Sequence, residues 1–198
     1  MNTIPINTVI IGAVLIVVAL AAIGWAVTQR RRSLKLQHRF GPEYERAVNE
    51  FGGKTKAEAE LTKREQRVAR LNIIPITAAD AARFSNAWSA LQGRFVDNPK
   101  GVPAEADLLV RELMLKRGYP MGDFELRAAD ISVDHPGVVK NYRAAQAIAA
   151  RDARGEADTE ELRQAVIHYR TLFDELLGVV PTKLASVPVV HSGVPVRT

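Results

Sequence analysis

The sequence predicts an all-α protein in four parts: an N-terminal transmembrane helix, a charged helical stalk, a compact bundle of four to five helices and a flexible C-terminal tail. Three observations lead to this prediction. An uncharged apolar run lies near the N-terminus, apolar residues recur at helical spacing through most of the remaining chain, and no stretch alternates apolar and polar residues as a half-buried strand would. The four parts are expected at residues 1–29, 30–71, 72–178 and 179–198.

The apolar run from Val9 to Val27 has the length and composition of a membrane-spanning helix. Its 19 residues would span roughly 28 Å, close to the ~30 Å hydrocarbon core of a bilayer. Eleven of them are Val, Ile or Leu, and each favours insertion by about 0.3 to 0.6 kcal/mol. A cleaved signal peptide would carry positive charge before the run, and a core helix would show a polar face; this run has neither. We therefore expect an uncleaved single-pass anchor.

A basic cluster follows the apolar run. Because Lys and Arg resist translocation, this flank should lie on the cytoplasmic side of a bacterial inner membrane, with the N-terminus outside and the C-terminal domain in the cytoplasm. There the cluster would face the anionic headgroups of the lipid bilayer, at about 1 kcal/mol per residue. It either sets only the topology or also binds lipid. The predicted membrane-surface residues are Arg30, Arg31, Arg32, Lys35 and Arg39.

The distribution of charge argues against nucleic acid as a partner. The whole chain has a net charge of +5, but residues 30–71 carry +6 and residues 72–178 carry −3. A domain that binds nucleic acid carries its positive charge on its own folded face. We therefore expect no nucleic-acid binding.

The stalk is predicted to contain charged helices. The anchor helix could continue through residues 34–40 until Gly41 and Pro42 interrupt it, and Pro42 suits the first turn of a second helix that stops at a Gly-Gly pair. A third helix, from Lys54 to Leu71, has apolar residues at heptad spacing, interrupted by Arg64. It could be a solvated helix lying against the domain, or a short coiled coil that joins two copies of the chain.

The bundle is predicted from helix ends and apolar spacing. Thr77 and Asp80 form a partial capping box, Gly118 and Gly178 are expected to end helices, and Asp134 is expected to cap the helix that opens at Pro136. The last helix has the clearest apolar period. From Val179 onward, prolines and glycine break any pattern, which predicts a flexible tail. The helices are expected at about 77–97, 103–117, 123–130, 136–154 and 158–177.

No arrangement of residues in the sequence requires catalysis, a cofactor or a metal ion. The absence of cysteine excludes disulfides, thiolate metal sites and cysteine nucleophiles. No two of the four histidines share a helix at metal-binding spacing. The Gly52-Gly53-Lys54-Thr55 segment lacks the upstream glycine and the strand of a phosphate-binding loop. We predict no catalytic, cofactor-binding or metal-binding residue.

Four large aromatic residues of the bundle are the candidates for a pocket lining. Trp88, Tyr119, Tyr142 and Tyr169 lie on or beside predicted helices. Aromatic residues at helical spacing are more often packed in a core than exposed in a site, because each buries a large apolar area. The core interpretation is therefore preferred, and the pocket is kept as an alternative.

The most distinctive part of the sequence is a run that ends in Pro99 and two later triplets that end in proline. The residues are Trp88-Ser-Ala-Leu-Gln92-Gly-Arg-Phe95-Val96-Asp97-Asn98-Pro99, Gly118-Tyr119-Pro120 and Asp134-His135-Pro136. In this block the chain resembles a group of uncharacterised bacterial single-pass membrane proteins, which have a short N-terminal anchor, a charged stalk and a helical domain with a Trp-x3-Gln-x2-Phe-Val-Asp-Asp-Pro-type run. The resemblance covers roughly residues 9–178. It implies this architecture and supplies no site, because the group has no known activity. Asn98 stands in place of the second Asp of the run, which argues against a metal-binding role.

Together these features predict a membrane-tethered helical interaction domain without catalytic activity. It would bind an unknown protein partner or a second copy of itself on the cytoplasmic face of the membrane. The alternative is a small-ligand-binding helical bundle, or an enzyme, on the same face.

Overall fold

The structure, a computed structural model, describes the backbone of residues 6–178 and the side chains of residues 15–178. Within that range its regular secondary structure is entirely α-helical, which confirms the all-α prediction for the part of the chain described. The predicted tail, residues 179–198, lies outside the described residues. The helices are α1 (Ile6–Phe40), α2 (Pro42–Glu50), α3 (Lys54–Val68), α4 (Ala78–Asp97), α5 (Val102–Arg117), α6 (Phe124–Asp134), α7 (Pro136–Asp152) and α8 (Thr159–Leu177).

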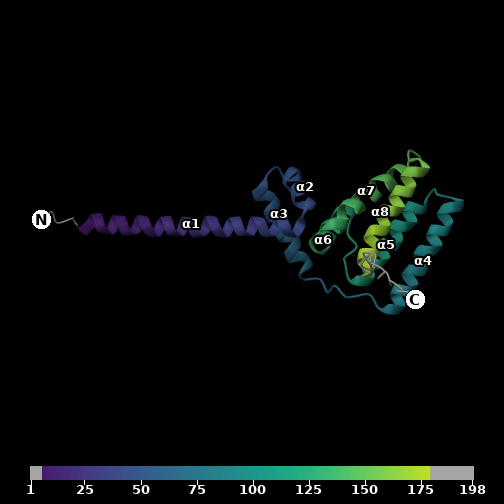
Figure 1. The fold of residues 1–198 in the computed structure, drawn as a ribbon, viewed down its shortest axis with the longest axis horizontal. Helices are drawn as coiled ribbons and strands as arrows, with labels where there is room; N and C mark the ends of the chain where they lie inside the picture. Colours follow the sequence, from purple (N-terminus) through teal and green to yellow (C-terminus); the bar gives the residue numbers. More distant parts are fainter. Residues whose placement is uncertain (1–5, 179–198) are drawn as a thin grey trace, which may run out of the picture.

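Helix α1 projects from a body built by the other seven helices (Figure 1). It is continuous over 35 residues, so the predicted anchor and the start of the predicted stalk form one helix. Leu36 and Phe40, in its last turns, are buried in the body. The predicted span Val9–Val27 is described with side chains only from Leu15 onward. Among the helices as described, none has an apolar stretch long enough to cross a bilayer.

The body has two hydrophobic cores. The larger core is formed by α4 to α8 and includes Phe84, Trp88, Tyr142, Tyr169 and Phe173. The smaller core lies at the base of the projecting helix, and α1, α2, α3 and α6 all contribute to it. Its buried residues are Leu36, Phe40, Tyr44, Ala47, Ala57, Leu61, Val68 and Val133. The C-terminal end of α1 is thus packed into the body, and no flexible linker separates the two.

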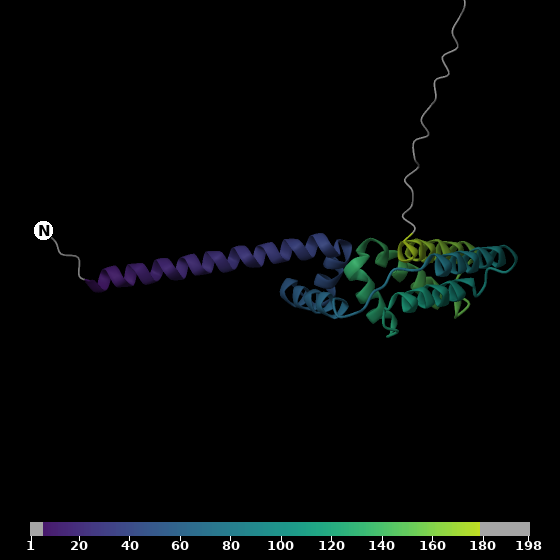
Figure 2. The same cartoon turned by 90° about the horizontal axis from the view of Figure 1, so that it is seen from below.

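Helix α3 packs beside α2 and α6 within the body (Figure 2). Of the seam positions, Ala57, Leu61, Arg64 and Val68 are buried on α3, and Leu71, beyond the end of the helix, is partly buried. The side chains that a coiled coil would use are therefore covered within the chain. Of the two interpretations of the seam, the structure agrees with a helix that lies against the domain.

Local signals place several helix ends where the sequence predicts them. The Thr77 hydroxyl accepts a hydrogen bond from the backbone N–H of Asp80 at 3.1 Å, and Asp158 with Glu161 forms a capping box at the start of α8. Gly118 ends α5 at φ 96° in the left-handed region. A Cβ at this glycine would collide with the backbone oxygen of Asn72. Glycine is required here both by the turn and by the close approach of the segment that follows α3.

The predicted cap at Asp134 is wrong. Helix α6 continues to Asp134, beyond its predicted end near 130, and the N-cap of α7 is His135, which makes no capping bond with its side chain. The extension follows from burial, because Ile131 and Val133 pack into the body. The Asp134 carboxylate lies 3.4 Å from the guanidinium of Arg39 on α1. A contact distant in sequence therefore takes the place of the local cap.

Candidate functional site

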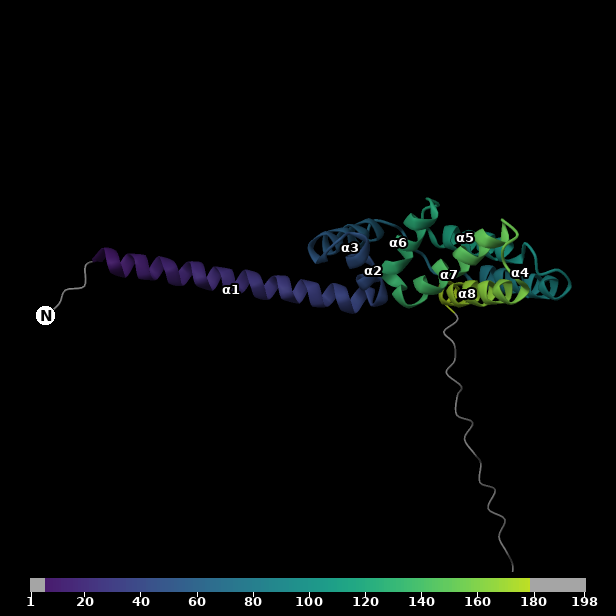
Figure 3. The same cartoon turned by 90° about the horizontal axis from the view of Figure 1, so that it is seen from above.

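A groove of about 890 Å³ lies between α1 and α3. The two helices lie side by side at the end of the body from which α1 projects (Figure 3). Helix α1 lines the groove from Trp25 to Gln37, and α3 lines it from Lys54 to Gln66. It therefore begins at the edge of the predicted anchor and extends into the body.

Tyr44 of α2 sets the spacing of the two helices that form the groove. Its ring is buried in the smaller core, and its hydroxyl donates a hydrogen bond to the Glu58 carboxylate of α3 at 2.8 Å. The same hydroxyl lies 3.5 Å from the Ser33 hydroxyl of α1. This one buried side chain thus connects both walls of the groove. It also positions Glu58, the acidic residue among those that line the groove.

The groove has an excess of basic side chains without internal partners. Arg30 and Arg32 come from α1, and Lys54 and Lys63 come from α3. Among the described residues, these four side chains form no ion pair or hydrogen bond with the rest of the protein. Their charge is therefore balanced by solvent ions or by a ligand.

The five predicted membrane-surface residues have different positions. Arg30 and Arg32 line the groove, whereas Arg31 and Lys35 are exposed outside it. Arg39 makes contacts within the protein. Its guanidinium lies 3.1 Å from the Glu65 carboxylate and donates a hydrogen bond to the Val133 carbonyl at 3.2 Å. The structure thus places Arg39 at the junction of α1, α3 and α6.

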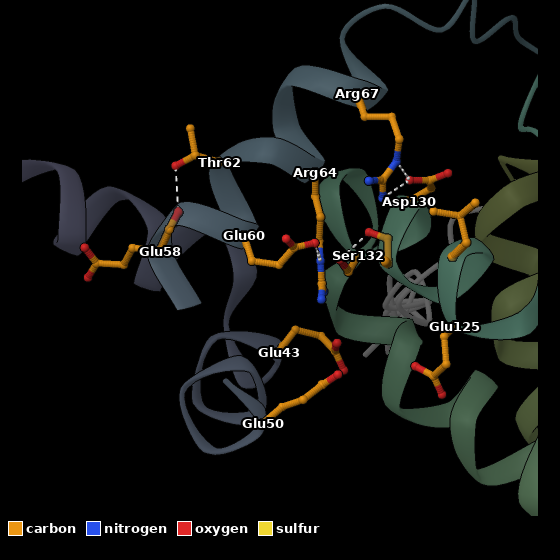
Figure 4. Close-up of polar contacts among 12 residues, drawn as sticks. Glu43, Glu50, Glu58, Glu60, Thr62, Arg64, Arg67, Glu125, Asp130 and Ser132 are labelled. Atoms are coloured by element: carbon orange, nitrogen blue, oxygen red, sulfur yellow. Dashed lines mark hydrogen bonds and ion pairs between the residues drawn. The ribbon is translucent and has the colours of Figure 1, made fainter. Parts of the chain in front are cut away.

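A buried ion pair joins the smaller core to the bundle (Figure 4). The Arg67 guanidinium of α3 donates to one Asp130 carboxylate oxygen of α6 through Nε at 2.7 Å and Nη2 at 2.6 Å. Asp130 is fully buried. Burial raises the pKa of its carboxyl above the ordinary value, and the hydrogen bond and positive charge of Arg67 oppose that rise. The two partners are 63 positions apart in the chain.

The four candidate pocket aromatics lie in the larger core. Trp88, Tyr119, Tyr142 and Tyr169 are each at most 1% exposed. The Trp88 ring packs on Phe173 with centroids 4.6 Å apart, and the Tyr142 and Tyr169 rings meet at 6.2 Å. The rings contact one another and other core residues, as the core interpretation predicts.

A polar cluster lies beside these tyrosines. The Tyr142 hydroxyl accepts a hydrogen bond from Arg127 at 3.1 Å, and the Tyr169 hydroxyl donates one to Gln146 at 3.1 Å. Burial raises the pKa of the nearby Asp107 carboxyl, while Arg127 and Arg111 oppose that rise. Burial also raises the pKa of Tyr119, to about 12. The Arg127–Tyr142 hydrogen bond is buried and the Tyr169–Gln146 bond is partly buried, whereas the four basic side chains of the groove are exposed.

The lysines of the groove were missed by sequence reasoning. Lys54 and Lys63 lie far along the chain from the basic cluster beside the anchor. The net charge of +6 over residues 30–71 was the available signal, because it exceeds what the five flanking residues contribute. That signal could not show that α3 folds back beside α1.

Fold and site together define an all-α protein whose first helix projects from a two-core body and has a basic groove at its base. Comparison with known protein families, with curated proteins and with solved structures found no match to this chain. The resemblance to bacterial single-pass membrane proteins therefore stays a prediction from the sequence.

Proposed function

We propose that this protein is a membrane-tethered helical interaction module. Helix α1 anchors it, and the body binds a protein partner or a second copy at the cytoplasmic face of a bacterial inner membrane. The observation that carries the proposal is the continuity of α1. Its apolar first part projects from the body, and its last turn ends at the fully buried Phe40.

The projecting part of α1 is apolar on every side. Leu15, Ile16, Val17 and Val18 are consecutive and are each 59–65% exposed. Four consecutive helical residues, about 100° apart, point around most of the helix circumference. A helix that packs on protein through one face has a polar face opposite. This part of α1 instead suits the hydrocarbon of a bilayer, where its backbone hydrogen bonds are all satisfied within the helix.

The packing of α1 into the body also fixes where the body lies relative to the proposed anchor. Because the end of α1 is part of the smaller core, the body is held at a set distance and orientation from the anchor. Tethering raises the effective concentration of the body near other membrane proteins. The basic flank would keep the body on the cytoplasmic side and close to anionic headgroups.

Placing two arginines in the anchor should release the protein from the membrane. Val17→Arg and Leu20→Arg each put a charge near the centre of the proposed span, at a cost of about 2.5 to 3.5 kcal/mol per residue. Their sum of about 6 kcal/mol is comparable with the whole insertion energy of about 3 to 7 kcal/mol from Val, Ile and Leu. Alkaline carbonate extraction of bacterial membranes should leave the wild-type chain in the pellet and release the double variant.

Leu34→Arg is the matched control for this experiment. Leu34 is also an exposed leucine of α1, but it lies beyond the proposed span. This variant should stay in the membrane pellet. If the wild-type chain itself is extracted by carbonate, the anchor proposal is wrong.

A photo-cross-linking amino acid at Leu108 or Leu115 should capture the partner of the body. Both side chains lie on α5 and are more than half exposed, so the substitution leaves the core intact. We expect a discrete adduct in intact cells, either with one other protein or with a second copy of this chain. The control position is Lys140, exposed on α7. If no adduct forms at Leu108, Leu115 or Lys140 and the chain runs as a monomer after detergent extraction, the interaction proposal is contradicted.

A further inference from the structure

We propose that the groove between α1 and α3 is a binding site for the headgroup of one anionic phospholipid, with the lipid phosphate held by Arg30, Arg32, Lys54 and Lys63. This inference rests on the proposed membrane anchoring. It goes further, because it assigns a specific lipid site to the body of the protein rather than a general attraction of basic residues to the membrane surface.

Charge is the first argument for the site. The groove has four basic side chains and Glu58, and the Glu58 carboxylate already accepts a hydrogen bond from Tyr44. Arginines elsewhere in the body are mostly paired with acids: Arg46 meets Glu50 at 3.0 Å and Arg170 meets Asp174 at 2.7 Å. The basic residues of the groove are therefore a concentration of uncompensated positive charge, which attracts anions such as phosphate.

Position is the second argument, and it selects a lipid over a soluble phosphate. Arg30 and Arg32 follow Val27, the end of the proposed span, by three and five residues. At about 1.5 Å per residue they lie about 5 to 8 Å beyond the hydrocarbon, which is the depth of the headgroups. Trp25 lines the same groove and is 67% exposed, as expected for an indole at the membrane interface.

The apolar edge of the groove provides for the acyl chains. Ile23 and Leu20 precede Trp25 on α1 and are both exposed. A phospholipid with its phosphate between the basic side chains could therefore lay its acyl chains along the projecting helix within the bilayer. A soluble phosphate would make only the polar half of these contacts.

Two double variants separate a built site from general electrostatic attraction. Arg30→Gln with Lys54→Gln removes one basic side chain from each wall of the groove. Arg31→Gln with Lys56→Gln removes one exposed basic residue from each of the same helices, close in sequence but outside the groove. Both pairs change the net charge equally, so general attraction weakens equally in both.

The test uses the full chain purified in a non-ionic detergent. Its thermal unfolding is followed by circular dichroism during titration with phosphatidylglycerol, with phosphatidylcholine, and with glycerol phosphate as the soluble headgroup. A ligand that binds the folded state raises the melting temperature as its concentration increases. We expect phosphatidylglycerol to raise it at lower concentration than phosphatidylcholine, and glycerol phosphate to have little effect.

The half-saturating phosphatidylglycerol concentration should increase about tenfold or more further in the groove variant than in the control variant. The control variant loses only the general attraction to the lipid, whereas the groove variant also loses charged hydrogen bonds to the phosphate. Equal increases in both variants, equal binding of the two lipids, or a full effect of glycerol phosphate alone would each overturn the inference. Carbonate extraction tests anchoring separately: a groove variant that stays in the membrane and binds phosphatidylglycerol like the wild type refutes the groove site and leaves the anchor standing.

Discussion

Replacing Phe40 by alanine should lower the free energy of unfolding of the smaller core by about 3 to 5 kcal/mol, the usual cost of removing a buried phenyl ring. Phe40 is 0% exposed and packs with Leu36, Tyr44 and Leu61 at the base of the projecting helix. The loss combines the transfer energy of the ring with a cavity that its neighbours cannot fill. Because the ring joins α1 to the body, this substitution should also loosen the packing of α1 on the body.

Leu34→Ala is the matched control on the same helix. Leu34 is 56% exposed, so its truncation should change stability by less than about 0.5 kcal/mol. Urea denaturation of the full chain in detergent, followed by circular dichroism, measures both variants. Hydrogen exchange should show faster opening of α2 and α3 in the Phe40 variant and little change in α8. Equal stabilities of the two variants would mean that the end of α1 is not part of the core.

Removing the guanidinium of Arg67 should cost about 3 to 5 kcal/mol, because it leaves a buried charge without its partner. Arg67→Ala deprives the fully buried Asp130 of both hydrogen bonds to one carboxylate oxygen. The other oxygen of the carboxylate has no partner in the described structure. Asp130→Asn should cost less, about 1 kcal/mol, because the Arg67 side chain is 34% exposed and can turn to water.

The double variant and the pH dependence identify the cause of this loss. Arg67→Ala with Asp130→Asn should be more stable than Arg67→Ala alone, because no charge is then left buried.

The pKa of Asp130 is already raised by burial, and loss of Arg67 raises it further. A raised carboxyl pKa means that the folded state favours the protonated form, so the penalty is absent below the ordinary value near 4, develops as the pH rises from there, and is complete above the folded value.

The deficit of Arg67→Ala relative to wild type should therefore shrink as the pH falls toward about 4. Denaturation of both proteins across this range measures it. A deficit that is the same at pH 4 and pH 7 would show that lost packing, and not the buried charge, causes the destabilisation.

Both substitutions act where residues 30–71 meet the helical bundle. The sequence predicts a boundary between stalk and helical domain near residue 72, and in the structure Val133 of α6 lies in the same core as Phe40 of α1. A second set of charges supports this junction, since Arg143 of α7 contacts Glu43 of α2 at 3.5 Å and Glu125 of α6 at 2.6 Å. Helix α1 is thereby connected to the bundle through several helices.

The predictable parts of the fold were those decided by residues close in sequence. Pro42 begins α2 and Gly118 ends α5 as expected, because backbone conformation and capping depend on the nearest few positions. The prediction failed at Asp134, where the local signal for a cap was outweighed by the burial of Val133 and by an ion pair with a residue 95 positions away. Arg64 was read as an interruption in a seam, and its side chain lies buried beside Glu60.

The sequence by itself determined the helical class, most of the helix ends and the uneven distribution of charge, because apolar period, capping and net charge are local properties. Only the tertiary structure decided that the seam of α3 is covered, that Arg39 serves the junction, and that Lys54 and Lys63 join Arg30 and Arg32 around one groove. Those outcomes depend on which helix faces are buried together. Burial of apolar area does not depend on separation along the chain, so no local pattern encodes which partners it selects.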